Sequence, residues 1–581
     1  DVYHATNGVL DQFNDNGSGQ SPWTWNDDYV FERNTTASGA VEANWLVNET
    51  SAGSPAEMNS VSFIASNWTG GGGTTWNNAA NWDNGIPDAN TDVTIPTGST
   101  IEIASGKAVA DCYNLIIEPT AGVTVNGTLN VNNDLVIESD ATGTGSIIDN
   151  GTLSITGTAT TELYLTQSRW WYIAPPVSDA TSAVIDAANA DNHFYYNDET
   201  VAGTGWVEIT DNTTDLFGGT LPVMTGYAVN FATKDTTLEF TGTLNTAKPS
   251  DLSINLTRNT GQQYDGFNLV GNPFPSAVDW GLDATDNWTK SNMATSVWYR
   301  TNGTFATYNS SGGTNTNGGQ RYIPAMQAFW VRADAGGGTL SCDNTIREHN
   351  TQAFYKQENT NPMVRLIVEN NGYTDETVVA FFDNAENGLD NYDTEKMFAD
   401  DENYPQIYSL LENNPLAING MQPVEENISI PVGFLTGAAG EFTISASDFE
   451  YLDESLKVYL EDTETDEMID ILSKGYSFNS TAITDNDRFV LHILKSGTGC
   501  EEIKETMIKV YSFRNNLYIN NLSGEITDAE ITVYNIAGQE VLHQKIDGLN
   551  SEKLEINENG YYLVNIISDN QVITEKIYIT E

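Results

Sequence analysis

Short runs of alternating apolar and polar residues recur along most of the chain, separated by Gly, Asn, Asp and Thr. Residues 100–103 and 129–131 are early examples, and residues 364–368 and 533–536 are later ones. A period of two places alternate side chains on opposite faces of a β-strand, and the intervening residues are those that favour tight turns. The pattern predicts an all-β protein. At 581 residues, the chain is too long for a single core and is expected to form several domains.

The phrase Asn126-Gly127-Thr128-Leu129 returns as Asn150-Gly151-Thr152-Leu153, 24 residues later. Repetition at this spacing is typical of stacked supersecondary units, in which each rung buries its inward face against the next. Residues 67–162 are therefore predicted to form a β-solenoid-like repeat region, with a β-sandwich as the alternative. Residues 1–66 are rich in Asn, Asp, Ser, Gly and Trp, and an irregular β N-terminal region is expected there.

After the repeats, the predicted strands contain more aromatic residues. Residues 163–351 are predicted to be one or more aromatic-rich β domains, and their aromatic residues, among them Trp170 and Trp206, are interpreted as core. Residues 352–495 contain strand patterns at the spacing of a β-sandwich. A short Gly- and Ser-containing linker then leads into a last segment, residues 501–581.

The last segment carries three recognisable phrases. They are K-V-Y-S at 509–512, V-Y-N-I-A-G-Q-E-V at 533–541 and N-G-Y-Y-L-V-N-I at 559–566. Their order resembles the type A-like C-terminal sorting domain of cargo proteins of the Bacteroidetes type IX secretion system. The chain departs from the commonest form of that motif at 510–514, where V-Y-S-F-R stands in place of V-Y-P-N-P.

The resemblance implies a small Ig-like β-sandwich that acts as an export address. It also implies a secreted protein at the cell surface of a Gram-negative Bacteroidetes bacterium, with the type IX translocon and its outer-membrane shuttle protein as partners. The motif residues that the resemblance assigns to this role are Val533, Tyr534, Gly538, Gly560, Tyr561, Tyr562, Lys576 and Ile577.

The charge of the chain excludes one class of partner. Twenty-four Lys and Arg stand against 80 Asp and Glu, for a formal net charge of −56. Nucleic acid is therefore not expected as a partner, because binding a phosphate backbone requires clustered basic residues. No apolar run approaches the ~20 residues that a membrane-spanning helix needs, so no transmembrane segment is expected.

Few residues suggest a catalytic or metal-binding site. The five histidines are scattered and no zinc-binding HExxH motif occurs. We therefore expect no enzyme and no cofactor, although a glycan-acting enzyme remains the alternative, because 80 acids can form paired carboxylates. Acidic loops are suited to Ca²⁺, and the calcium candidates, for which ordinary solvated turns are the simpler interpretation, are Asp88, Asp92, Asp485 and Asp487.

Two functions remain open. The first is a secreted structural or adhesive surface protein that self-associates into a filament or surface layer. The second is a carbohydrate-binding or polysaccharide-processing surface protein, with Trp76 and Trp298 as candidates for stacking on sugar. Because Trp in β proteins is mostly buried, core positions are the simpler interpretation of both residues.

Overall fold

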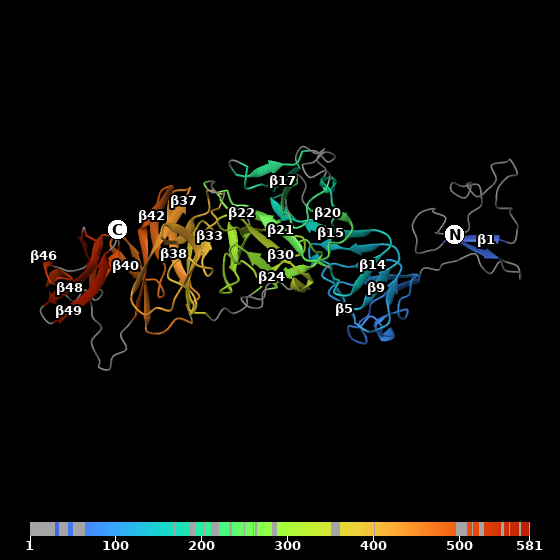
Figure 1. Ribbon diagram of the computed structural model, residues 1–581, viewed down its shortest axis with the longest axis horizontal. Coiled ribbons are helices and arrows are strands. Elements are labelled where there is room, and N and C mark those ends of the chain that lie inside the picture. The colour runs from blue at the N-terminus through green and yellow to red at the C-terminus, as the bar shows by residue number, and fades with distance from the viewer. Residues whose placement is uncertain are drawn as a thin grey trace. The chain divides into compact units, whose positions relative to one another are not determined.

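The computed structural model describes most of the chain from residue 64 onward, together with two earlier strands (Figure 1). The described ranges are 29–33, 45–49, 64–166, 169–185, 192–201, 204–210, 220–231, 235–248, 250–259, 261, 264–281, 287–301, 303–349, 361–399, 401–449, 451–495, 508–513, 515–521, 528–547, 551–556, 558–568 and 571–579.

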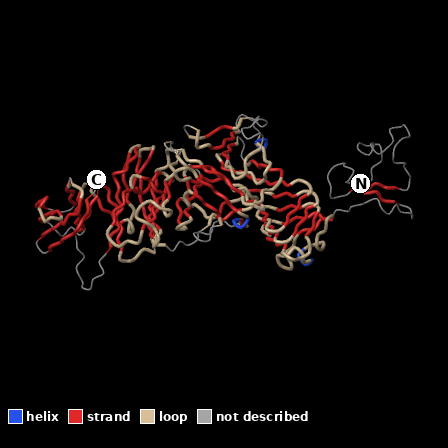
Figure 2. Tube along the Cα trace, in the orientation of Figure 1, coloured by secondary structure: helices blue, strands red, loops and turns tan. Residues whose placement is uncertain are grey.

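Strands and turns make up almost all of these residues (Figure 2). The only helical elements among the described residues are three 3-10 turns: η3 (Ala79–Asn81), η4 (Ser182–Val184) and η6 (Asn344–Ile346). Within the same residues, no helix is long and apolar enough to cross a membrane. The all-β prediction is confirmed.

The chain forms two compact units. Unit 1 comprises Asp1–Glu118, Val123–Val136 and Asn150–Thr158, and unit 2 comprises Pro119–Gly122, Ile137–Asp149 and Ala159–Glu581. Each is described by itself.

Unit 1 is built from short stacked strands, and its only described antiparallel hairpin is β1 (Tyr29–Arg33) with β2 (Trp45–Glu49). The stacked strands are β3 (Ile64–Asn67), β4 (Thr91–Ile95), β5 (Thr100–Ile103), β6 (Ala110–Cys112), β7 (Leu115–Ile117), β8 (Gly122–Val125), β9 (Thr128–Val131), β10 (Leu135–Ile137) and β14 (Thr152–Ile155). They follow one another around three faces, as shown by the parallel pairing of β4 with β3 and β7, and of β9 with β6 and β14. Their inward side chains are buried apolar residues. The β-solenoid prediction for this region is confirmed.

The repeated Asn-Gly-Thr phrase forms a ladder in the solenoid. The Asn150 amide nitrogen donates to the Asn126 amide oxygen at 3.1 Å, and the Asn126 amide nitrogen donates to the Glu102 carboxylate at 2.9 Å. The glycines pack beneath the ladder: a Cβ on Gly151 would lie 2.0 Å from the carbonyl oxygen of Gly127. Identical phrases recur because each rung presents the same turn to the next.

The first part of unit 2 contains five small sheets. Its strands are β11 (Ser139–Asp140), β12 (Gly143–Thr144), β13 (Ser146–Ile148), β15 (Ala159–Leu165), β16 (Trp171–Ile173), β17 (His193–Asn197), β18 (Trp206–Glu208), β19 (Tyr227–Asn230), β20 (Thr236–Gly242), β21 (Leu252–Leu256), β22 (Phe267–Gly271), β23 (Ala277–Asp279), β24 (Trp288–Ser291), β25 (Ser296–Arg300), β26 (Phe305–Asn309), β27 (Thr314–Thr316), β28 (Tyr322–Ile323), β29 (Ala328–Arg332), β30 (Gly338–Cys342) and β31 (Arg347–Glu348). The sheets have the orders β11-β12, β16-β19-β17-β18, β21-β30-β24, β22-β29-β25-β26-β27 and β28-β23-β31, and β15 also pairs with β20.

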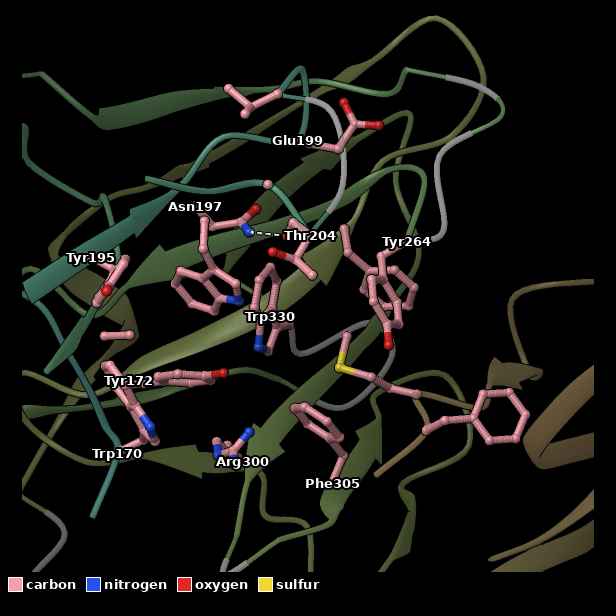
Figure 3. Close-up of a pocket in the computed structure, with 17 residues that line it drawn as sticks. Trp170, Tyr172, Tyr195, Asn197, Glu199, Thr204, Tyr264, Arg300, Phe305 and Trp330 are labelled. Atoms are coloured by element: carbon pink, nitrogen blue, oxygen red, sulfur yellow. Dashed lines mark hydrogen bonds between the residues drawn. The ribbon is translucent and has the colours of Figure 1, made fainter. Parts of the chain in front are cut away.

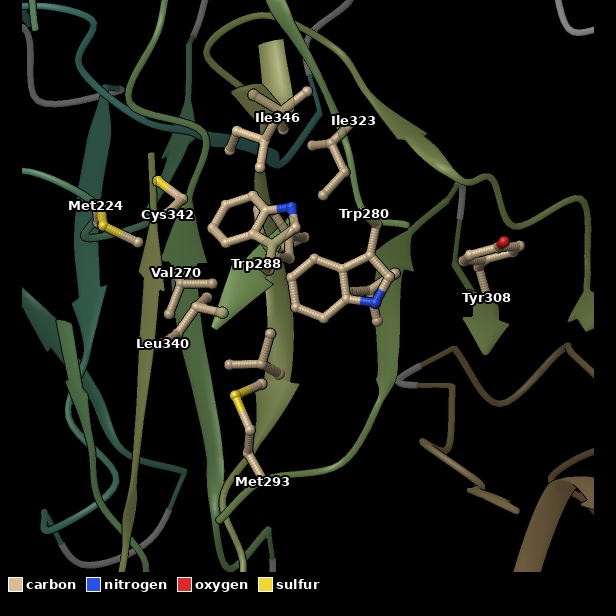
Figure 4. Close-up of a cluster of buried hydrophobic side chains, with 14 of the residues drawn as sticks. Met224, Val270, Trp280, Trp288, Met293, Tyr308, Ile323, Leu340, Cys342 and Ile346 are labelled. Atoms are coloured by element: carbon tan, nitrogen blue, oxygen red, sulfur yellow. The ribbon is translucent and has the colours of Figure 1, made fainter. Parts of the chain in front are cut away.

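Trp280 and Trp288 lie together in the main core of this part of unit 2, with ring centroids 5.3 Å apart (Figure 4). Both indole N–H groups donate to backbone carbonyls, of Thr295 and Asp279 respectively. The prediction that these aromatic residues form core is therefore correct for these two tryptophans, whose polar atoms are satisfied.

The next part of unit 2 is a single eleven-stranded sheet. Its strands are β32 (Met363–Asn370), β33 (Tyr373–Phe381), β34 (Thr394–Glu395), β35 (Gln406–Leu411), β36 (Asn414–Met421), β37 (Ile428–Thr436), β38 (Gly440–Ser447), β39 (Leu456–Asp462), β40 (Glu467–Asp470), β41 (Tyr476–Ser480) and β42 (Ile483–Lys495). Phe434 of β37 contacts Phe442 of β38 and Phe478 of β41, with ring centroids 5.1 and 5.2 Å away. These strands are distant within the sheet, so its two halves face each other across one core, as in a sandwich.

The sorting segment at the end of unit 2 has two sheets, of orders β43-β44-β47 and β46-β45-β48-β49. Its strands are β43 (Ile508–Phe513), β44 (Asn516–Asn521), β45 (Asp528–Asn535), β46 (Glu540–Asp547), β47 (Ser551–Glu555), β48 (Gly560–Ser568) and β49 (Gln571–Ile579). Leu517 and Ile519 of the first sheet share one core with Val533, Val564 and Ile566 of the second. The expected small β-sandwich is present.

Candidate functional site

An aromatic pocket of about 340 Å³ lies in the first part of unit 2 (Figure 3). Strands of the β16-β19-β17-β18 sheet and of the β22-β29-β25-β26-β27 sheet supply most of its walls. Nine aromatic side chains line it: Trp170, Tyr172, Tyr195, Trp206, Tyr264, Phe267, Phe305, Trp330 and Phe398. Its size falls in the range of small-molecule sites, and such sites are mainly apolar with a few polar groups.

A small residue keeps one wall of the pocket open. In the strand register, Ala228 of β19 lies directly opposite Tyr172 of β16 on one side and Tyr195 of β17 on the other. Neighbouring positions across a sheet place their side chains on the same face. Because the central position carries only a methyl group, a space remains between the two tyrosine rings.

Three rings pack against one another in another part of the pocket wall. The ring centroids of Tyr172, Trp206 and Trp330 lie 5.7 to 6.0 Å from one another. Trp330 is 7% exposed, and its indole N–H has no hydrogen-bond partner in the part of the chain that the structure describes. A buried donor without an acceptor is unfavourable and rare in a folded protein. The pocket wall thus contains a hydrogen-bond donor that is left for another acceptor.

Polar side chains lie at two ends of the pocket, with Glu199 at one and Arg300 at the other (Figure 3). Glu199 is 7% exposed, and its Oε1 accepts hydrogen bonds from the backbone N–H groups of Asn259 and Gly266. Its Oε2 is buried and lacks a partner among the described residues. The side chain of Asn197, also at the wall, donates to the carbonyl of Thr204 at 3.2 Å. These groups place polar atoms at the two ends and at one wall of an otherwise apolar pocket.

The two tryptophans proposed from sequence as sugar platforms are buried. Trp76 is 0% exposed and packs edge-on against Trp82, with centroids 4.7 Å apart. Trp298 is 1% exposed and donates its N–H to the carbonyl of Glu395 at 3.0 Å. Neither indole offers a free face to a sugar, which corrects both assignments: each residue is core, the interpretation that the composition of β proteins favours.

The first pair of calcium candidates forms hydrogen bonds within unit 1. Asp88 accepts from the backbone N–H of Asn90 at 2.9 Å and from the Thr91 hydroxyl at 2.9 Å, as in an Asx turn. Asp92 accepts from the side-chain amide of Asn114 at 2.8 Å. The Asn114 amide oxygen in turn accepts from Asn133 at 2.8 Å, one rung further on. Asp88 therefore closes a turn, and Asp92 ends a second side-chain ladder of the solenoid.

The second pair lies in β42 of the eleven-stranded sheet. Asp485 accepts hydrogen bonds of 3.0 Å from the backbone N–H groups of Asp487 and Arg488. No group of three or more His, Cys, Asp or Glu able to hold a metal occurs among the described residues. A turn accounts for Asp88 and a bulge within β42 accounts for Asp485, and the calcium prediction gains no support from the geometry.

The sorting-motif residues divide into buried and exposed sets. Val533, Tyr562 and Ile577 are part of the core of the sorting segment. Tyr561 and Lys576 are exposed, and the Lys576 ammonium lies 4.4 Å from the centre of the Tyr561 ring. Tyr534 lies in β45 and is half-buried, whereas Gly560 begins β48. Gly538 has φ +76°, a conformation that favours glycine, in the turn after β45.

The sequence does not predict the pocket, and the interpretation of Trp170 and Trp206 as core is wrong, because both residues line the pocket and Trp170 is 36% exposed. The signal that distinguishes lining residues from core ones is the strand register, which sequence alone does not supply. His492 is buried, and its two ring nitrogens lie 2.8 Å from Ser429 and from Glu461.

Two family comparisons match the chain. Residues 513–580 match the secretion system C-terminal sorting domain, which confirms the resemblance to type IX secretion cargo. The protein is therefore secreted to the cell surface or the extracellular space, and it is handled by the type IX machinery. The match begins inside the segment expected at 501–581. No curated protein matches the chain.

Solved structures resemble the chain only weakly. A two-domain fibronectin type III segment of chicken tenascin is 11% identical, over 24% of this chain and 94% of that one, with a TM-score of 0.12. The BSP domain of a biofilm-associated protein is 12% identical, over 73% and 92% of the two chains, with a TM-score of 0.15. A β-glucuronidase of Faecalibacterium prausnitzii is 8% identical, over 72% and 46%, with a TM-score of 0.11. Residues 67–493 match a further family model, and by this match the chain belongs to the family described as a domain of unknown function, DUF8693.

Proposed function

We propose that this secreted protein is a surface adhesin that binds glycan in the aromatic pocket. The observation that carries the proposal is the aromatic wall to which Tyr172, Trp206 and Trp330 contribute, and which lines a cavity of ligand size. In a protein delivered to the cell surface, the ligands within reach are extracellular, and polysaccharides are abundant among them.

Sugars suit this pocket for a physical reason. The negative face of an aromatic ring attracts the weakly positive C–H groups that line one face of a pyranose. The hydroxyl groups at the edge of the sugar then need hydrogen-bond partners. The unpartnered N–H of Trp330 is a donor at the wall, and Asn197 and Glu199 add polar atoms.

Binding without hydrolysis agrees better with the pocket than catalysis does. Most glycosidases use two carboxyl groups that flank the scissile bond. Among the described lining residues, Glu199 is the only carboxylate, and one of its oxygens is engaged by two backbone N–H groups. We therefore propose recognition as the role of the pocket, which unites the adhesive and the carbohydrate-binding expectations.

A glycan array tests this proposal. The full chain is expected to bind one class of glycan, and Trp206→Ala is expected to weaken that binding at least tenfold, or about 1.4 kcal/mol. Tyr451→Ala removes a 45% exposed aromatic residue outside the pocket and is the matched control. The absence of binding to any glycan, or equal binding by all three proteins, contradicts the proposal.

A second candidate function, self-assembly, is favoured by one observation. Strand β49 is the last strand of its sheet, and its outer side chains Val572 and Tyr578 are 67% and 51% exposed. An edge strand with apolar side chains can pair with another copy. Light scattering over a range of concentrations tests this: growth in mass that deletion of residues 501–581 abolishes is expected, and growth that survives the deletion contradicts it.

A further inference from the structure

A second cavity, of about 550 Å³, adjoins the aromatic pocket within unit 2. The two share Trp170, Tyr172 and Arg300 as lining residues. They therefore form one cleft with two compartments, in which Trp170 and Tyr172 stand at the junction. A cleft of this combined size accommodates more than one sugar ring.

The second compartment has an unusual charge for this protein. Its two charged lining residues are Arg169 and Arg300, and no carboxylate lines it within the described part of the chain. Acidic residues outnumber basic ones by more than three to one in the whole sequence. The charged residues that line this compartment are therefore basic, although the chain as a whole is strongly acidic.

Arg169 is held in place. The Arg169 guanidinium lies over the ring of Trp171, 3.7 Å from its centroid, which fixes its plane by stacking. Burial lowers the pKa of Arg169, and the positive charge of Arg300 lowers it further. An anion that binds near both guanidinium groups is attracted by both positive charges.

We propose that the glycan bound by this cleft is acidic and that a uronic-acid carboxylate is bound by Arg169 and Arg300 in the second compartment. This inference rests on the proposed glycan-binding function. The planar guanidinium matches a carboxylate through two parallel hydrogen bonds, which an ammonium group cannot provide. Glu199 lies at the end of the aromatic pocket away from Arg300 (Figure 3), so it repels an anion from that end and leaves the anionic residue at the arginines.

The cleft also orients such a ligand. One sugar ring stacks in the aromatic pocket, against Trp206, and its neighbour along the chain passes Trp170 and Tyr172 to reach the arginines. The shortest ligand that occupies both compartments is a disaccharide with one uronate. Polymers in which uronates alternate with neutral sugars present this pair once in every repeat.

Calorimetric titration of the full chain tests the inference. The probes are tetrasaccharides of galacturonate, of glucuronate with a neutral sugar, and of mannuronate with guluronate, each also after reduction of its carboxyl groups to the neutral sugar. At least one uronate is expected to bind tenfold or more tightly than its reduced form. Arg169→Gln and Arg300→Gln should each remove most of that difference, whereas Lys107→Gln, which removes an exposed charge in unit 1, should not.

Salt dependence of the unaltered protein provides a test that needs no variant. Raising NaCl from 50 to 500 mM should weaken uronate binding and leave binding of the reduced sugars nearly unchanged. Equal affinity for both forms overturns the inference while glycan binding stands. A sulfated tetrasaccharide and a tetraglutamate peptide serve as further probes, and binding of the sulfated sugar alone, or equal binding of the peptide, overturns the uronate assignment. Failure of every sugar, charged and neutral, overturns the proposed function as well.

Discussion

The phenolic hydroxyl of Tyr511 donates a 2.7 Å hydrogen bond to the carboxylate of Glu461. Tyr511 belongs to the first strand of the sorting segment, and Glu461 belongs to the eleven-stranded sheet before it. The Glu461 carboxylate also lies 2.8 Å from Nε2 of His492, and the ring of His492 packs on that of Tyr511 with centroids 4.2 Å apart. Burial and the adjacent Glu461 raise the pKa of Tyr511, so its hydroxyl remains a donor. A buried polar contact thus joins the export address to the domain it follows.

Tyr511→Phe should uncouple the two domains. The variant keeps the stacking of the ring on Tyr518, at 5.1 Å. It removes one of the two partners of Glu461 Oε2 and the acceptor of the buried Asn520 side-chain amide. We expect a loss of about 1–3 kcal/mol, measured as an earlier unfolding transition of the sorting segment in urea. Tyr578→Phe removes a hydroxyl from an exposed ring and is the control; equal effects of the two changes would contradict the role of the contact.

His349 should make unit 2 sensitive to acid. Its Nδ1 lies 2.8 Å from the Ser146 hydroxyl, and burial together with the nearby charge of Arg347 lowers the pKa of His349 to about 4. The unfolded chain therefore takes up the proton first, near pH 6.5. The stabilisation is complete above pH 6.5 and is lost as the pH falls through about 4, which amounts to about 3 kcal/mol.

His349→Asn keeps a polar partner for Ser146 and removes the titration. The unfolding free energy of the variant, measured in urea at pH 7 and pH 4, should fall less than that of the parent. Asp393 acts in the opposite direction, because burial raises its pKa to about 7 and its stabilisation is present in acid and lost as the pH rises through 7. The comparison between variant and parent cancels this contribution. Identical pH dependence of the two proteins would show that His349 does not titrate as stated.

Gly151→Ala should disrupt the solenoid. The added methyl group would lie 2.0 Å from a backbone oxygen of the neighbouring rung, so the rungs must separate. We expect destabilisation of about 1–3 kcal/mol or more, seen as a lower melting temperature by circular dichroism. Gly388→Ala places its methyl group where no atom lies within 4 Å and should have little effect. A stable Gly151→Ala variant would contradict the stacking.

Ala228→Phe should close the aromatic pocket. The new ring would stand between Tyr172 and Tyr195 in the cross-strand row and fill the space that a sugar occupies. We expect at least a tenfold loss of glycan affinity in calorimetry, without loss of the melting transition. Ala228→Gly keeps the space open and should keep the affinity. Undiminished binding by Ala228→Phe would place the glycan elsewhere.

The repeat and the sorting motif could be predicted from the sequence because their signals are local. The Asn-Gly-Thr phrase recurs since Asn150 and Asn126 occupy equivalent turns. The sorting motif alternates buried Val533 with half-buried Tyr534, which a period of two expresses directly. Both features depend on neighbours in the chain or on the next rung.

The pocket could not be predicted because it depends on contacts between distant strands. Tyr172, Trp206 and Trp330 come from β16, β18 and β29, and only the pairing of those strands brings their rings together. Trp298 and Trp330 occupy opposite positions in adjacent strands, yet Trp298 is core and Trp330 lines the pocket. Composition does not separate the two. Likewise, Asp92 looks like a cation ligand in sequence, but the structure pairs it with Asn114 of the next rung.

Saturation-transfer NMR of a bound oligosaccharide tests the central claim most directly. Irradiation of the aromatic protons of the protein should saturate most strongly the C–H protons on one face of a single sugar ring. The effect should disappear in Trp206→Ala and persist in Tyr451→Ala. No transfer to any sugar that binds, or transfer that Trp206→Ala leaves unchanged, would contradict glycan recognition by the aromatic pocket.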